Sequence, residues 1–107
     1  MKVIYNKAIP FKGYKCVNML GVLFVREGCT MTADDYRHEA IHTAQMKEML
    51  YAPFYVLYVL EWLWHLARLG DAKAAYRAIS FEREAYAHEG EAGYLKTRKK
   101  FNQYKKN

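Results

Sequence analysis

The sequence predicts an α+β fold that is mainly helical, with short N-terminal strands or a hairpin followed by about four helices. Three observations support this. β-branched and aromatic residues concentrate before residue 27, a helix-start signal stands near residue 32, and proline and glycine then interrupt long helical patterns. The 107 residues suffice for one domain around one core. We expect residues 1–95 to form this domain and residues 96–107 to form a basic C-terminal tail, either a helix end or disordered.

The first strands are predicted by apolar and β-branched runs. Residues 2–5, "KVIY", favour a short strand, and residues 9–13, which contain a proline and a glycine, favour a turn. Residues 14–26, "YKCVNMLGVLFVR", are rich in strand-forming residues and contain Gly21. Because glycine within a strand often marks a bend, we expect this segment to be one bent strand or a hairpin about Gly21.

The first helix is predicted by its capping residues. Thr32 offers a hydroxyl N-cap, and Asp34 and Asp35 in the first turn favour the positive end of the helix dipole. The helical pattern then runs to about Tyr51. A second helix, roughly residues 53–69, is expected to have its proline in the first turn and to end at the glycine that follows.

Two further helices follow in the sequence. Residues 71–79, "DAKAAYRAI", predict a short third helix. Ser80 is expected to cap a fourth helix that runs from Phe81 into the basic tail. The order of elements is therefore a small β unit followed by about four helices.

Residues 49–67, "MLYAPFYVLYVLEWLWHLA", are the most hydrophobic part of the chain and are about as long as a membrane span. Pro53, Glu61 and His65 lie within this run, and charges flank it on both sides. A charge near the middle of an isolated span costs at least a few kcal/mol. The run therefore favours a buried core helix, with a membrane-embedded or membrane-lying helix as the alternative.

The net charge of +6 is located at the C-terminus. Residues 96–107 contain six of the 17 basic residues and no acid, so the remainder of the chain is balanced. We therefore expect no nucleic-acid partner. Cys16 and Cys29 have no metal-site spacing, and the N-terminus lacks the apolar run of a signal peptide. A cytoplasmic location is expected, with a position peripheral to the membrane left open.

The stretch "YRHEAIHTAQ" carries the chemistry. His38 and His42 lie four residues apart, so a helix places them on one face, where both can reach an ion about 2 Å away. Glu39 is rotated by about 100° and stands beside the ion, where it can take a proton from a metal-bound water. This is the HExxH arrangement. Two surface histidines sharing a face are the alternative, but the position inside a capped helix favours a functional site.

Two histidines need a third protein ligand, with one position left for water. The metzincin pattern is excluded, because Gln45 and Glu48 occupy the positions where it has glycine and histidine. Glu48 also lies off the histidine face. A distant acid is required, and "FEREAYAHE" offers Glu82 and Glu84 in the first turn of the fourth helix. Acids placed there for the helix dipole are the alternative reading.

With HExxH and the later "Glu82-Arg83-Glu84-Ala85", the chain resembles the gluzincin-type zinc metallopeptidases. In that group a glutamate on a later helix completes the site. The resemblance implies a zincin-like fold, a Zn²⁺ cofactor, a catalytic base at Glu39 and a third ligand at Glu82. Glu84 is the second choice for this ligand and Glu61 the third.

Other family features are matched less closely. Tyr86 stands where the family often has an aspartate or asparagine that holds a histidine ligand. Residues 20–26 are the candidate for the edge strand that pairs with an extended peptide, with a plain core strand as the alternative. Larger members have a second domain as the other wall of the cleft. Here the aromatic helix, another subunit or a membrane would supply that wall, or the site is open.

Two functions follow as expectations. The first is a minimal zinc-dependent peptidase acting on a peptide or protein substrate, with Tyr86, His88 or His65 stabilising the oxyanion. The second is a non-catalytic metal-binding module that associates with a membrane or partner through residues 49–67 and the basic tail. Contact with a membrane surface and homo-oligomer formation are left open.

Overall fold

The computed structural model describes residues 2–7 and 15–104. Three strands form one sheet: β1 (Lys2–Asn6), β2 (Cys16–Met19) and β3 (Val22–Arg26). Their order is β1-β3-β2, with β1 parallel and β2 antiparallel to β3. Of the two alternatives expected for this segment, one bent strand or a hairpin, the hairpin about Gly21 is the correct one, and this glycine adopts a φ of 86° in the turn. The turn predicted at residues 9–13 lies outside the described residues.

The position of β3 corrects one expectation. Residues 20–26 were the candidate for a peptide-binding edge strand, but β3 is hydrogen-bonded on both sides. Its side chains Leu23 and Val25 are fully buried. A strand with both edges paired has no free backbone groups to offer to a peptide. The alternative expectation, a core strand, is the correct one.

Helix α1 (Ala33–Glu48) begins as the sequence predicts. The Thr32 hydroxyl accepts from the Asp35 backbone N–H at 3.1 Å, and the Asp35 carboxylate accepts from the Thr32 N–H at 2.9 Å, which is a complete capping box. Its buried face carries more polar than apolar side chains: His38, Ile41, His42, Gln45 and Met46. Because buried polar groups are costly unless hydrogen-bonded, this face requires partners from elsewhere in the fold.

The next two helices also match their predictions. Helix α2 (Ala52–Leu69) has Pro53 in its first turn and ends at Gly70, whose φ of 70° is left-handed. Helix α3 (Ala72–Ala78) is capped by Asp71, whose side chain accepts from the Ala74 N–H at 2.9 Å. The two helices pack together as a hairpin.

Helix α4 (Ser80–His88) differs from its prediction at both ends. Ser80 does not cap it; instead the Glu61 carboxylate of α2 accepts from the Ser80 N–H at 2.8 Å and from its hydroxyl at 2.7 Å. The helix also stops well before the basic segment. Gly93, with a φ of 93°, lies in the turn before a short helix α5 (Tyr94–Thr97), and a 3₁₀ turn η1 (Asn102–Tyr104) follows.

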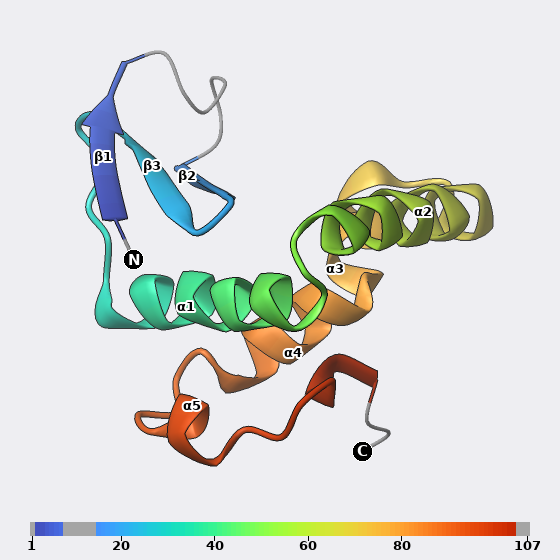
Figure 1. The fold of residues 1–107 in the computed structure, drawn as a ribbon. Helices are drawn as coiled ribbons and strands as arrows, with labels where there is room; N and C mark the ends of the chain where they lie inside the picture. Colours follow the sequence, from blue (N-terminus) through green and yellow to red (C-terminus); the bar gives the residue numbers. More distant parts are fainter. Residues whose placement is uncertain (1, 8–14, 105–107) are drawn as a thin grey trace.

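Figure 1 shows α1 in the middle of the molecule, with the sheet on one side and α4 and α5 on the other. The α2–α3 hairpin projects to one side of this body. The main core cluster joins α1, α2 and α4 through the buried residues Met46, Phe54, Ile79 and Phe81. A second cluster joins α1 to α4 and α5 through Ile41, Ala85 and Tyr94.

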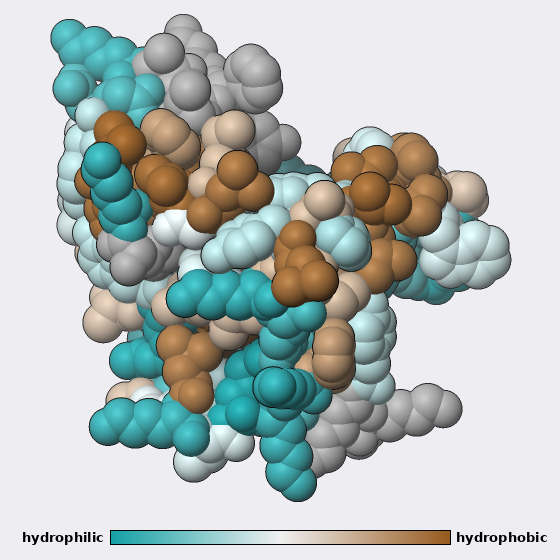
Figure 2. Space-filling view, in the orientation of Figure 1, coloured by the Kyte–Doolittle hydropathy of each residue, from teal (hydrophilic) through white to brown (hydrophobic). Residues whose placement is uncertain are grey.

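The aromatic helix corrects another expectation. Of its side chains only Phe54 is buried, whereas a core helix would bury most of them. Several of its large apolar side chains are exposed, and Figure 2 shows apolar surface over the projecting hairpin. Within residues 2–7 and 15–104, no helix has the combination of length and apolar character that crossing a bilayer requires.

The C-terminal segment is packed onto the domain as far as the structure describes it. Arg98 is only 4% exposed and forms ion pairs with Glu48 of α1 and Glu84 of α4. Lys99 and Lys100 are exposed. Residues 96–104 are therefore neither a continuation of α4 nor a free tail, because a buried arginine fastens them to two helices.

Candidate metal centre

Three side-chain atoms converge between α1 and α4. His38 Nε2 and His42 Nε2 each lie 3.1 Å from Glu82 Oε1, and the two nitrogens are 3.1 Å apart. The helical spacing places both imidazoles on the buried face of α1, and the first turn of α4 brings the carboxylate against them. All three residues are buried.

The protonation of the two imidazoles follows from their outer nitrogens. His38 Nδ1 lies 3.0 Å from Glu89 Oε1, and His42 Nδ1 lies 2.8 Å from Gln45 Oε1. A carboxylate or amide oxygen can only accept, so each Nδ1 carries a proton and donates it. In the neutral imidazoles each Nε2 then presents a lone pair towards the other and towards Glu82. Three lone pairs at this separation are stabilised by a cation between them.

The triangle fits a metal ion. An ion bound at about 2.0–2.1 Å with tetrahedral angles holds its ligands roughly 3.3–3.4 Å apart. The observed separations of 3.1 Å need an expansion of only a few tenths of an ångström. His38 and His42 also form a group with Glu39 whose ligand atoms all lie within 4.8 Å of one another. These residues could therefore hold a metal ion. Glu82 Oε1, at 3.1 Å from both Nε2 atoms, lies well within the same 4.8 Å distance.

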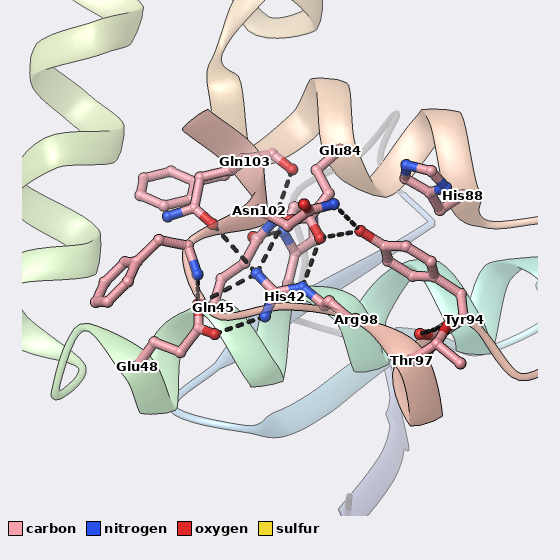
Figure 3. Close-up of polar contacts among 12 residues, drawn as sticks. His42, Gln45, Glu48, Glu84, His88, Tyr94, Thr97, Arg98, Asn102 and Gln103 are labelled. Carbon is pink, nitrogen blue, oxygen red and sulfur yellow. Dashed lines mark hydrogen bonds and ion pairs between the residues drawn. The ribbon is translucent and has the colours of Figure 1, made fainter. Parts of the chain in front are cut away.

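A buried polar network fixes the orientation of His42 (Figure 3). The Gln45 amide nitrogen donates to the Phe81 carbonyl at 3.0 Å and to Glu84 Oε1 at 3.0 Å. With both amide hydrogens used, the Gln45 oxygen must face His42 Nδ1. Outer partners of this kind orient metal-binding histidines and set their tautomer.

The same network continues to the C-terminal segment. Glu84 accepts hydrogen bonds from Arg98 and Tyr94, and Arg98 also donates to both oxygens of Glu48, at 2.7 and 3.1 Å (Figure 3). Burial alone would raise the pKa of Glu84, but the hydrogen bonds from Arg98, Tyr94 and Gln45 hold it below its usual value. Glu84 is thus an ionised hydrogen-bond acceptor that supports Gln45.

The electrostatics of the triangle favour charge separation. Burial opposes a charge on His42, but the adjacent Glu82 carboxylate outweighs it and raises the pKa of His42 to about 9. Burial likewise works against ionisation of Glu82, but the charge of His42 and the hydrogen bonds from His38, His42 and Tyr58 hold its pKa well below the usual range. Tyr58 of α2 donates to the second Glu82 oxygen at 2.6 Å. Without a metal ion, these shifts favour a protonated His42 beside an ionised Glu82.

Glu39 faces an open cleft beside the triangle. Burial raises the pKa of its carboxyl above the usual value, although the neighbouring histidines oppose the effect. The cleft has a volume of about 330 Å³. It is lined by Lys15, Cys16, Asp35, His38, Glu39, Tyr76, Tyr86 and Glu89.

Two tyrosines form the α3–α4 side of this cleft. The ring of Tyr86 packs edge-on against His38, with centroids 4.4 Å apart, and its hydroxyl lies 3.1 Å from that of Tyr76. Burial raises the pKa of Tyr76 far above its ordinary value, so its hydroxyl stays protonated. Tyr86 therefore does not replace the aspartate or asparagine of the gluzincin pattern; Glu89 supports His38 instead.

Several sequence candidates lie elsewhere. Glu61 uses both carboxylate oxygens to cap α4, and Glu84 supports Gln45. His65 is bonded to Arg68 on α2. His88 is stacked on Tyr94 and paired with Glu91. In the described part of the chain, none of these four residues is hydrogen-bonded to Nε2 of His38 or of His42.

Sequence reasoning missed four supporting residues: Gln45, Tyr58, Tyr76 and Glu89. Two of them had a readable signal. Gln45 follows His42 by three residues, and Glu89 follows Glu82 by seven, so each pair shares a helix face. Tyr58 and Tyr76 had none, because their contacts depend on how α2 and α3 pack against α4.

Comparison with known proteins adds no family to this geometry. No protein-family model, curated protein or solved structure matches the chain. The geometry alone defines the site: His38, Glu39 and His42 have HExxH spacing and form a group that could bind a metal ion.

Proposed function

We propose that the protein is a zinc-dependent peptidase in which His38, His42 and Glu82 bind the metal and Glu39 is the general base. The observation that carries this proposal is the triangle of two imidazole nitrogens and one carboxylate oxygen, each pair 3.1 Å apart, beside a cleft that contains Glu39. Three protein ligands with an open fourth position are typical of catalytic zinc sites.

The donor set favours zinc. Two imidazoles and one carboxylate form a mixed nitrogen and oxygen site, whereas magnesium and calcium prefer oxygen alone. Zinc bound there supplies the positive charge that polarises a substrate carbonyl and lowers the pKa of a coordinated water to about 7.

Glu39 then moves the proton. It takes the proton that the attacking water loses as the water oxygen bonds to the carbonyl carbon, and it returns this proton to the amine nitrogen as the C–N bond breaks. A base for this step needs a pKa close to the working pH. Burial shifts the Glu39 carboxyl in that direction, because its pKa lies above the usual value.

The tyrosine pair supports the oxyanion. One hydroxyl of Tyr76 and Tyr86 can donate to the other, which leaves the second hydroxyl proton for the oxygen that becomes negative. Both residues line the cleft that contains Glu39. Of the three oxyanion candidates taken from the sequence, Tyr86 alone lies in this cleft.

The test compares Glu39→Gln with a matched control, Glu27→Gln, at an exposed acid that does not line the cleft. We expect Glu39→Gln to retain about one zinc per chain, while its turnover number on a peptide mixture falls by at least about a hundredfold. Glu27→Gln should retain both. Retained turnover in Glu39→Gln, with a metal-stripped control inactive, would falsify the mechanism.

A non-catalytic metal-binding module is the second candidate. The exposed apolar face of α2 favours it, because such a surface is typical of association. Zinc binding at one ion per chain, with no hydrolysis of any peptide in a mixed library, would support this candidate over the peptidase.

A further inference from the structure

The α2 helix carries a stripe of exposed apolar side chains. Its five members are between 49 and 66% exposed: Val56, Val59, Leu60, Leu63 and Trp64. At about 100° per residue they cover roughly 140° of the helix surface. Phe54, Tyr58 and Glu61 lie on the opposite side, where they contact the core, Glu82 and α4. The stripe is therefore the outer face of a helix whose inner face packs against the body of the domain.

The size of this stripe is that of the largest apolar patches on monomeric proteins, which are often functional. Its five side chains present on the order of 500 Å² of apolar surface, near the upper end of the largest patches on monomeric proteins. Figure 2 shows hydrophobic surface over the projecting hairpin. Exposed surface of this extent is unfavourable in water, so an occupant is expected.

Basic side chains flank the stripe at its C-terminal end. Arg68 lies one turn after Trp64, and Lys73 follows in the first turn of α3; both are exposed. The two acids of the hairpin are used as helix caps, Glu61 for α4 and Asp71 for α3. The hairpin carries three basic residues, Arg68, Lys73 and Arg77, against these two acids, so its net charge is positive.

We propose that this face of α2 lies against the surface of an anionic lipid bilayer. A helix with an apolar face that contains tryptophan and with basic residues along its margin is typical of interfacial binding. Long basic side chains at such a margin reach the anionic headgroups while the apolar face enters the acyl boundary.

The structure favours a bilayer over a second copy of the chain. A stable protein interface buries about 800 Å² on each partner, which exceeds the area of the stripe. The positive margin is complementary to anionic headgroups. The helix also lies on the surface without crossing it, because removing α2 from the body would break the Tyr58–Glu82 and Glu61–Ser80 contacts.

The experiment measures co-sedimentation of the full chain with vesicles of phosphatidylcholine alone or with about a third phosphatidylglycerol. Wild type should bind the anionic vesicles, and Leu60→Gln/Leu63→Gln should reduce the partition coefficient more than tenfold. Arg68→Gln/Lys73→Gln should weaken binding about fivefold for each charge removed. Leu95→Gln, at an exposed leucine of α5, is the matched control and should leave binding unchanged.

Circular dichroism and a thermal melt of each variant establish that it is folded. The proposal is overturned if wild type fails to bind anionic vesicles, or if the two α2 variants bind as wild type does. It is also overturned if sedimentation equilibrium finds a micromolar dimer that Leu60→Gln/Leu63→Gln dissociates. Because vesicle binding and hydrolysis are measured separately, either proposal can fail without the other.

Discussion

Arg98 offers the sharpest test of how the C-terminal segment supports the metal centre. Its side chain is 4% exposed, and its guanidinium lies between Glu48 and Glu84, whose side chains are 10% and 2% exposed. The change Arg98→Met keeps a similar length of apolar stem but removes the positive charge. Two carboxylates are then left buried without their cation, and Gln45 loses the fixed position of its acceptor Glu84.

The magnitude follows from this burial. Breaking a buried ion pair by removing one partner costs about 3–5 kcal/mol, because the remaining charge is uncompensated. Here one arginine pairs with two carboxylates, so we expect the free energy of unfolding to fall by an amount near the upper end of this range. Protonation of one of the two acids limits the decrease. For a domain of this size each kcal/mol lowers Tm by about 4–8 °C, so a loss of about 4–5 kcal/mol predicts a decrease of about 16–40 °C.

Urea unfolding and thermal melts in excess zinc measure the loss. Lys100→Met, at an exposed basic residue of the same segment, is the control and should change the free energy of unfolding by less than about 0.5 kcal/mol. Replacing all three charges, as in Arg98→Met/Glu48→Leu/Glu84→Leu, should recover much of the stability. A loss below about 1 kcal/mol in Arg98→Met would refute the reasoning.

The pH dependence of this effect has a definite sign. The pKa of Glu84 in the folded state lies below its usual value, because the hydrogen bonds from Arg98, Tyr94 and Gln45 outweigh the effect of burial. A lowered pKa contributes stability above the unfolded value of about 4.3, and this contribution is lost as the pH falls through the folded value. The difference between wild type and Arg98→Met should therefore shrink below about pH 4.

Three further predictions concern the site and its supports. Gln45→Leu removes the acceptor of His42 Nδ1 and should weaken zinc binding about 10–100-fold in a chelator competition. In the metal-free protein the pKa of His42 is raised to about 9, so its contribution to stability is complete below about pH 6.5. That contribution is lost as the pH rises through about 9, and Tm without zinc should fall over this interval, whereas an unchanged Tm would contradict the pairing with Glu82. Glu61→Gln weakens the cap of α4 and should lower the free energy of unfolding by about 1 kcal/mol. The slope of this free energy against urea concentration should stay unchanged.

Local sequence determined the strands, the first three helices and the placement of the two histidines. The Thr32 capping box, Pro53 and Gly70 act within a few residues of the helix ends they define, so their effect could be read directly. The placement of His38 and His42 on one face follows from the period of the helix alone. Glu82 was selected from three acids because its sequence context resembled a known pattern, and α4 carries it to within 3.1 Å of both imidazoles.

Only the tertiary structure decided what supports these residues. Ser80 was the natural cap for α4 by its residue type, but the Glu61 carboxylate reaches that position from α2. Residues 49–67 were expected to form a core helix because they are so hydrophobic. Hydrophobicity does not show how many other elements will cover a helix, and here one face packs on the core while the other is exposed. Arg98 belongs by composition to a basic tail and by packing to the centre of a network. The physical reason is the same in each case: the free energy of a buried charge or an apolar face depends on partners tens of residues away, which the local pattern does not contain.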